Sequence, residues 1–185
     1  TYYERWEKSW EFQALLKARA IAGDRELGER YVAALAPKVW SSAARENFVE
    51  SVQRMRERVM EHIPAEEQGY QLKLGAGGLR DIEFTVQLLQ LVHGLSDEAV
   101  RQRGTVAALD ALVAEGYIGR EDAAAFACDY RVLRVWEHRL QLHRLRRTHL
   151  MPRTPDGLRF LARASRLAES GAEIQVMWEQ LGRQV

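Results

Sequence analysis

The segment best equipped for chemistry is the run Lys73-Leu74-Gly75-Ala76-Gly77-Gly78-Leu79-Arg80, the only glycine cluster in the chain. Glycines let a backbone approach a phosphate closely, and amide groups at the start of a following helix attract anions. The run matches neither G-x-x-x-x-G-K-[ST] nor G-x-G-x-x-G, because Arg80 stands where the last glycine of the second pattern belongs. Two interpretations stay open: a tight turn that needs positive φ angles, or a phosphate site made by Lys73, Gly75, Gly77, Gly78 and Arg80.

Two acids and an amide follow this loop, namely Asp81, Glu83 and Gln87. On a helix, Asp81 and Glu83 lie about 200° apart, so they cannot ligate one metal ion together. We expect Asp81 to serve the positive end of the helix dipole. Glu83 shares a side with apolar residues, and a buried carboxylate needs a cation. Lys17 or Arg19 is the expected partner, although both also suit simple compensation of the dipole at the end of the first helix.

A basic stretch occupies residues 131–153, where seven arginines stand against one acid, Glu137. It predicts a docking face for an acidic partner, and Trp136 would be available for stacking on nucleic-acid bases. The alternative is a solvent-exposed face whose arginines pair with Asp110 and Glu115. The five histidines lack the H-E-x-x-H spacing, so no metal site is predicted. The predicted docking residues are Arg131, Arg134, Arg139, Arg144, Arg146 and Arg147.

Hydrophobic periodicity of the helical kind runs through most of the chain. It predicts an all-α fold, an antiparallel helical bundle of about six main helices with one Gly-rich loop and a short helical tail. We expect a single helical domain over 1–185, with a main bundle over 1–150 and a tail over 151–185. The first expected helix ends near 19, with Tyr3, Trp6, Trp10 and Ala14 inward. The second runs from a cap at Asp24 to near Pro37, with Leu27, Tyr31 and Leu35 inward. Further helices are expected at 44–63, 79–93 with Gly94 at its C′ position, 105–116, 120–149, 156–168 and 172–184, and an extended segment is expected at 70–74.

Composition excludes several classes of protein. The 185 residues carry 27 basic and 26 acidic side chains and a single cysteine, Cys128. One cysteine allows no internal disulfide and no cysteine-based zinc site, so a cytoplasmic setting is expected. The small net charge gives no reason to expect nucleic acid or a membrane as a partner. Thr1 begins the chain without an initiator Met or a signal pattern, so we expect a fragment of a larger protein.

Several segments, taken in order, resemble a known family. They are WEFQALLKAR (10–19), AGD (22–24), KLGAGGLRDIEF (73–84), QLLQ (87–90), LRVWEHRLQ (133–141) and THLMP (148–152). Together they resemble the bifunctional glutamine synthetase adenylyltransferases/adenylyl-removing enzymes over roughly residues 2–165. The form of the 73–84 segment is closer to the first, adenylyl-removing half. Ala20 stands where proline is common, and the tail after 165 has no clear match.

The resemblance implies a helical domain that follows a nucleotidyltransferase domain and completes its nucleotide or phosphate site. The whole enzyme would use ATP, ADP or phosphate with Mg²⁺ to place AMP on a tyrosine of glutamine synthetase or to remove it by phosphorolysis. It would respond to PII signal protein and glutamine, and it would be related to the helical part of PII uridylyltransferases.

Metal-dependent transfer of this kind needs a D-x-D pair after a Gly-Ser turn, and the chain contains neither. We therefore expect no catalytic residue within it, an inactive fragment, and a catalytic sheet before Thr1. Lys17, Arg19, Lys73, the 75–78 loop and Arg80 would bind phosphate oxygens, supported by Asp81, Glu83 and Gln87. The alternative from another class is a non-catalytic helical module that binds nucleic acid or an acidic protein through residues 131–153.

Overall fold

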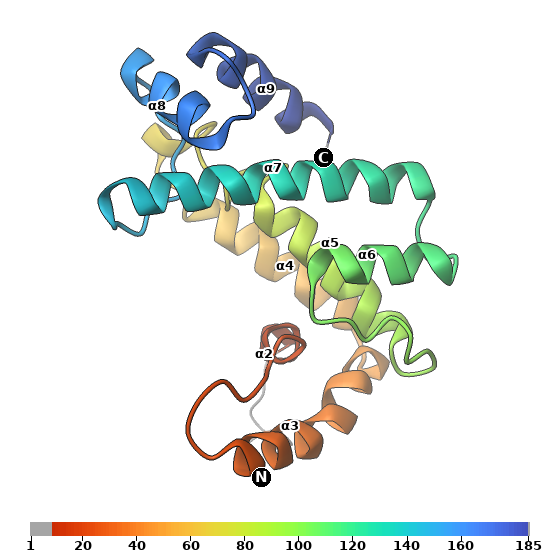
Figure 1. Ribbon diagram of the computed structural model, residues 1–185. Helices are drawn as coiled ribbons and strands as arrows, with labels where there is room; N and C mark the ends of the chain where they lie inside the picture. Colours follow the sequence, from red (N-terminus) through yellow and green to blue (C-terminus); the bar gives the residue numbers. More distant parts are fainter. Residues whose placement is uncertain (1–8, 185) are drawn as a thin grey trace. The chain divides into compact units, whose positions relative to one another are not determined.

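The computed structural model describes residues 9–184, apart from the side chains of residues 9, 144 and 182–184. These residues form eight α-helices and two short 3-10 helices, with no strand among them (Figure 1). The predicted all-α class is confirmed. The α-helices are α2 (Ser9–Leu15), α3 (Arg25–Trp40), α4 (Phe48–Glu61), α5 (Leu79–His93), α6 (Thr105–Ala114), α7 (Arg120–Arg144), α8 (Pro155–Ser165) and α9 (Gly171–Gln184), and the 3-10 helices are η1 (Ser42–Ala44) and η2 (Ala65–Glu67).

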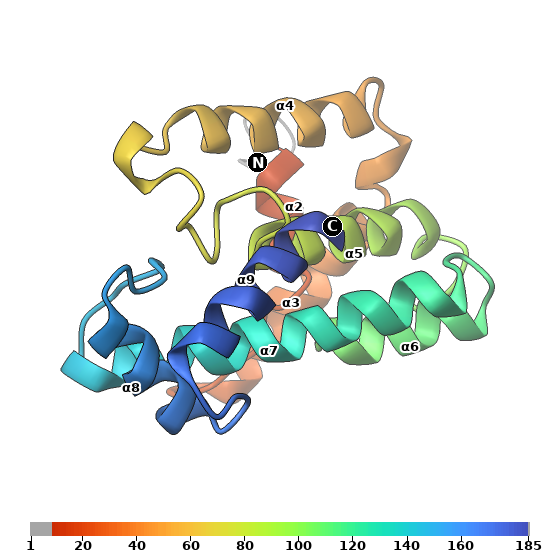
Figure 2. The same cartoon turned by 90° about the horizontal axis from the view of Figure 1, so that it is seen from above.

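The chain divides into two compact units, and each has a core of its own. The first contains the described residues up to Glu57 together with Phe84–Gly119, and the second contains Arg58–Glu83 and the residues from Arg120 onward. The segment predicted as a tail belongs to the second unit, because Leu161, Ile174 and Leu181 share a core cluster with Leu133 and Trp136 of α7. Figure 2 shows α9 lying over α7, as this shared core requires.

The first unit buries Phe12 and Leu16 of its N-terminal segment against Val39, Phe48 and Leu91. Among the described residues, the inward face predicted for the first helix is wrong. Trp10 is 48% exposed and Ala14 is exposed, whereas Phe12 is fully buried. Tyr3 and Trp6 lie outside the described residues. The helix also ends at Leu15 rather than near 19.

Helix α3 begins as predicted, because the Asp24 side chain caps it by accepting the amide of Leu27 at 2.9 Å. It does not stop at Pro37 but continues to Trp40, since Val39 is buried and Trp40 packs against the same core. Leu27 and Tyr31, predicted to point inward, are both exposed, and Leu35 is buried as expected.

Helix α5 has the predicted bounds, but Gly94 is not the left-handed C′ residue expected after it. The positive-φ glycines are Gly23, Gly69, Gly77 and Gly116. A Cβ on Gly94 would lie 2.6 Å from the Trp40 ring and 2.5 Å from the Gln90 carbonyl oxygen. A glycine stands there because the ring packs against its backbone, not because the turn needs a positive φ.

Two other elements are shorter than expected. Helix α7 ends at Arg144 rather than near 149, and α4 begins at Phe48 because residues 42–44 form η1. The extended segment at 70–74 reduces to one antiparallel bridge between Gln71 and Leu150. Two backbone hydrogen bonds frame it, from Leu72 to the His149 carbonyl and from Met151 to the Tyr70 carbonyl, each 2.8 Å long.

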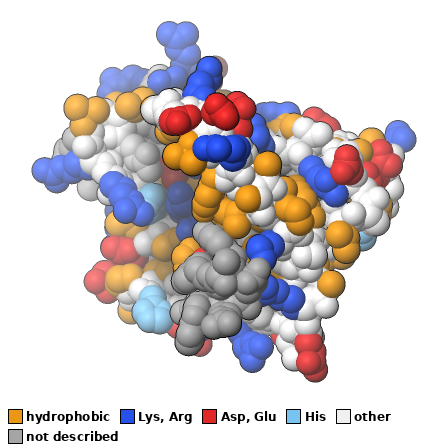
Figure 3. All heavy atoms as spheres, turned by 90° about the horizontal axis from the view of Figure 1, so that it is seen from below, with side chains coloured by type: hydrophobic (Ala, Val, Ile, Leu, Met, Phe, Trp, Pro, Cys, Tyr) orange, Lys and Arg blue, Asp and Glu red, His pale blue; other side chains and the backbone are white. Residues whose placement is uncertain are grey.

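No described helix is at once long and apolar enough to cross a membrane. On the face drawn in Figure 3, basic and acidic side chains occur among one another and among apolar ones. The balanced composition therefore extends to this surface.

Candidate functional site

The Gly-rich loop is a tight turn into α5 that only glycines can form. Gly77 has a φ of 71°, in the left-handed region. A Cβ on Gly75 would lie 2.6 Å from the Gln71 carbonyl oxygen, and one on Gly78 would lie 2.9 Å from the Leu72 carbonyl oxygen. The turn interpretation of the glycine cluster is therefore confirmed.

Most amides of this loop donate hydrogen bonds within the chain, so they are not free to bind an anion as amides at a helix start can be. Gly77 donates to the Asp81 carboxylate at 2.9 Å, so Asp81 serves the helix start as predicted. The amides of Gly75, Gly78, Leu79 and Arg80 donate to carbonyls of the preceding turns at 2.9 to 3.2 Å. Positive charge at this site must therefore come mainly from side chains.

A buried charge network centred on Glu137 of α7 lies beside the loop. Glu137 is only 3% exposed, and its Oε1 atom lies 3.3 Å from Lys73 Nζ and 3.5 Å from His149 Nδ1. Its other oxygen accepts from Arg134 at 2.5 Å. Lys73 is thus held at its ammonium group while 23% of its side chain stays accessible. Helix α7 therefore orients Lys73, although Glu137 lies more than sixty positions further along the sequence.

Arg134 joins Glu137 to a second carboxylate, Glu83 of α5. Its guanidinium pairs with Glu83, and its Nε donates to the Tyr130 hydroxyl at 3.1 Å. Glu83 is buried, as predicted, but the cation found beside it is Arg134, which the sequence had placed on a docking face. Lys17 donates to the Thr105 hydroxyl at 3.1 Å. Lys17, Arg19 and Gln87 all belong to the first unit.

The electrostatics of this network favour its charged form. Burial alone would raise the pKa of Glu137, but the hydrogen bond from Arg134 and the charge of Lys73 outweigh it and lower that pKa. Burial alone would lower the pKa of Arg134, yet its bond to Tyr130 and the charge of Glu83 raise it. Burial and the nearby Lys73 charge lower the pKa of His149, with Glu137 opposing them. His149 therefore stays neutral under conditions in which its neighbours are ionised.

Sequence reasoning missed Glu137, Tyr130 and His149 as members of this site. A signal for the first two existed, since Tyr130, Leu133, Trp136 and Glu137 recur at helical spacing and therefore share the buried face of α7. A polar residue on such a face needs a partner. No comparable pattern points to His149, which reaches Glu137 from the extended segment after α7.

The predicted docking arginines separate into groups. Arg131, Arg139, Arg146 and Arg147 are exposed, Arg134 belongs to the charge network, and the Arg144 side chain lies outside the described part. Trp136 is fully buried with its ring centroid 6.5 Å from that of Trp178, so the expectation that it is available for stacking is wrong.

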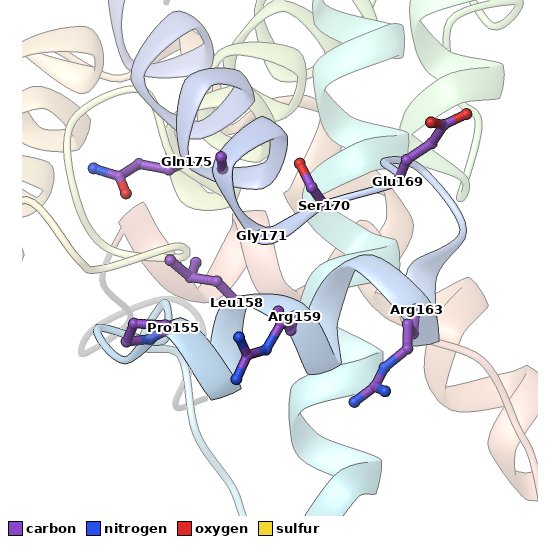
Figure 4. A pocket seen from close by; sticks show the side chains of 9 residues that line it. Pro155, Leu158, Arg159, Arg163, Glu169, Ser170, Gly171 and Gln175 are labelled. Atoms are coloured by element: carbon purple, nitrogen blue, oxygen red, sulfur yellow. The ribbon is translucent and has the colours of Figure 1, made fainter.

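A separate hollow of about 500 Å³ lies between α8 and α9. In Figure 4 Arg159 and Arg163 point away from Ser170 and Gln175, so the polar groups do not converge on one point. Arg159 also pairs with Asp156. Among the described residues, moreover, no three His, Cys, Asp or Glu side chains are placed to hold a metal ion.

Fold and site together define an all-α protein in which a glycine loop at a helix start is tied to a buried lysine–glutamate–arginine network. A family model described as GlnD PII-uridylyltransferase matches residues 46–185. Because this match covers most of the chain, the chain belongs to that family.

Curated relatives confirm the resemblance seen in the sequence. A bifunctional glutamine synthetase adenylyltransferase/adenylyl-removing enzyme from Leifsonia xyli subsp. xyli is 67% identical over 184 residues, which are 100% of this chain and 18% of the relative. The enzyme of that name from Mycobacterium tuberculosis strain H37Rv is 57% identical over 187 residues, 99% of this chain and 19% of the relative. The one from Streptomyces coelicolor is 62% identical over 163 residues, 88% and 16% respectively. The chain thus spans less than a fifth of the length of these relatives.

Proposed function

We propose that the chain is the helical part of an enzyme that places AMP on glutamine synthetase or removes it. The observation that carries this proposal is the identity of 57 to 67% over essentially the whole chain to relatives named for that activity. In the enzyme, the chain completes the nucleotide or phosphate site of an adjacent nucleotidyltransferase domain. Response to a PII signal protein belongs to the same proposal, and it is supported by a family description that names PII.

Lys73 is the central residue of the proposed phosphate site. Glu137 fixes its ammonium group, while part of the side chain remains accessible to a phosphate oxygen. Arg80 adds positive charge from the same loop, Asp81 holds the loop and Glu83 holds Arg134. For Lys17 and Arg19, which belong to the first unit, a role in phosphate binding is proposed from the family resemblance alone. Gly75, Gly77 and Gly78 let the loop bring Lys73 and Arg80 to the start of α5. Gln87 supports the site from the same helix.

The chemistry of removal is a phosphorolysis. An oxygen of orthophosphate attacks the phosphorus of the AMP group, the bond from phosphorus to the tyrosine oxygen breaks, and ADP and free tyrosine result. Cations held in advance near the phosphoryl oxygens stabilise charge in the transition state. The described residues offer no fitting ligand set for Mg²⁺, so its ligands are expected in the adjacent domain.

Variants of the full-length enzyme test this proposal. Arg19→Gln changes an exposed side chain and should reduce the rate of AMP removal from adenylylated glutamine synthetase by about tenfold or more, with unchanged stability. Lys73→Gln should reduce this rate as well, and it should also lower the stability of the second unit because the buried Glu137 loses one of its cations. Arg25→Gln, which changes another exposed cation of the first unit at the start of α3, is the matched control and should retain the rate within about twofold. Normal rates for both Arg19→Gln and Lys73→Gln would reject the phosphate site.

A further inference from the structure

The C-terminal end of α7 carries an apolar hollow framed by basic side chains. Its volume is about 620 Å³, and none of its lining residues is acidic. We call this surface the α7 terminal patch. It is lined by Val135, His138, Arg139, Gln141, Leu142, Leu145, Arg146 and Arg147. Val135, His138, Arg139 and Leu142 recur at helical spacing, so they share a face of α7 that differs from the buried face of Leu133 and Trp136.

Two leucines of this patch are unusually exposed. Leu142 is 62% exposed and Leu145 is 86% exposed. Large apolar side chains that cluster on a surface mark interaction sites more often than singly scattered ones do. Their exposure thus points to a partner that covers them.

The backbone of Leu145 supports this interpretation independently. Leu145 has a φ of 49°, and the amide of Arg146 donates to the Gln141 carbonyl at 3.1 Å, the bonding of a helix end that favours glycine. A side chain in this conformation is strained relative to glycine. The Leu145 side chain is almost wholly exposed, so apolar contacts within this structure do not offset the strain of its backbone.

The chemistry of the patch selects an acidic protein segment over nucleic acid. Arg139, Arg146 and Arg147 require carboxylates from the partner, while the two leucines require apolar side chains. Single-stranded nucleic acid is bound mainly by exposed Phe, Tyr and Trp side chains that stack on bases, and no residue of these three types lines the patch. Trp136 is buried on the other face of the helix.

We propose that the α7 terminal patch docks an acidic, partly apolar segment of glutamine synthetase. The inference rests on the proposed function, because a protein-modifying enzyme must hold its protein substrate. Of the arginines in residues 131–153, the proposed docking surface contains three. It also contains two leucines, which the charge pattern of the sequence does not indicate. Arg134 has no part in it, because its guanidinium serves the buried network.

The test measures binding of fluorescently labelled glutamine synthetase to the full-length enzyme, together with the kinetics of AMP transfer and removal. Leu145→Gly is the most informative variant, because glycine suits the left-handed conformation and folding is not impaired. Leu145→Gly and Leu142→Gln should each weaken binding about fivefold or more, and Arg146→Glu about tenfold or more. KM for glutamine synthetase should rise while kcat stays within about twofold. Arg120→Glu, at the other end of α7, and Leu167→Gln are the matched controls and should bind normally.

Each other outcome overturns the docking proposal. Unchanged binding in all three patch variants does so directly. Loss of affinity for a labelled oligonucleotide in Arg146→Glu, with glutamine synthetase binding intact, assigns the patch to nucleic acid. A change of sedimentation coefficient in Leu145→Gly assigns it to a second copy of the chain. A wild-type enzyme without activity on glutamine synthetase rejects the proposed function itself, whereas an active enzyme with normally binding variants rejects docking alone.

Discussion

Replacement of Glu137 by glutamine tests whether the buried network holds the second unit together. The substitution keeps the shape of the side chain and removes its charge. Removal of one partner from a fully buried ion pair costs about 3–5 kcal/mol. Here Lys73 and Arg134 are about one quarter exposed. Both lose the Glu137 carboxylate, but Arg134 keeps Glu83, whereas Lys73 keeps no ion pair seen among the described residues. We therefore expect Glu137→Gln to lower the free energy of unfolding by about 2 kcal/mol at neutral pH.

The pH dependence separates this charge effect from simple repacking. The pKa of Glu137 is lowered in the folded chain, so its stabilisation is complete above its unfolded value of 4.5 and is lost as pH falls through the folded pKa. The difference between wild type and Glu137→Gln should thus shrink towards zero in acid. Removal of this carboxylate should also lower the pKa of His149 further, because Glu137 opposes the Lys73 charge there.

Urea unfolding followed by tryptophan fluorescence measures the effect, because Trp136 and Trp178 report on the second unit. Glu83→Gln should lower the free energy of unfolding by less, about 1 kcal/mol, because Lys73 keeps its ion pair with Glu137 and Arg134 keeps one carboxylate partner. Glu179→Gln, on the exposed side of α9, should change stability by less than about 0.5 kcal/mol. Equal losses in Glu137→Gln and Glu179→Gln, or a loss that does not vary with pH, would refute the reasoning.

Three further changes have definite expected outcomes. Asp129 is 5% exposed, its Oδ2 has no hydrogen-bond partner and burial raises its pKa, so Asp129→Asn should stabilise the chain by about 1 kcal/mol at pH 7. This gain in stability should vanish in acid. Because the folded pKa of Asp129 is raised, the contribution of Asp129 to the stability of the wild type is complete below 3.8 and is lost as pH rises through the folded pKa. Urea unfolding at several pH values measures this dependence. Gly94→Ala should destabilise the first unit by about 1–3 kcal/mol through its clash with Trp40, measured by thermal unfolding. Trp136→Ala should lower the unfolding free energy by about 3–5 kcal/mol and Trp136→Phe by much less, because the indole nitrogen has no hydrogen-bond partner.

Local chemistry made the helix starts predictable, whereas the inward faces depended on tertiary packing. Asp24 caps α3 by a bond three residues away, and Gly78 precedes α5 at the expected boundary. Trp10 was expected inside because it shares a helical spacing with Tyr3, Trp6 and Ala14, yet the unit buries Phe12 on a different face of the same helix. Which face of an amphipathic helix turns inward depends on what covers it, and periodicity does not contain that information.

The candidate site shows the same division between local and distant contacts. The glycine turn and the bond from Gly77 to Asp81 lie within five residues, so they follow from the local sequence. The cation for Glu83 could be any of several in the chain, and Arg134 reaches it from 51 positions away. Position in sequence favoured Lys17 and Arg19, whereas the face of α7 favoured Arg134. A buried acid on an otherwise apolar face therefore predicts the existence of a partner better than its identity. Glu137, at helical spacing from Leu133 and Trp136, is such an acid, and its partners come from two separate segments of the chain.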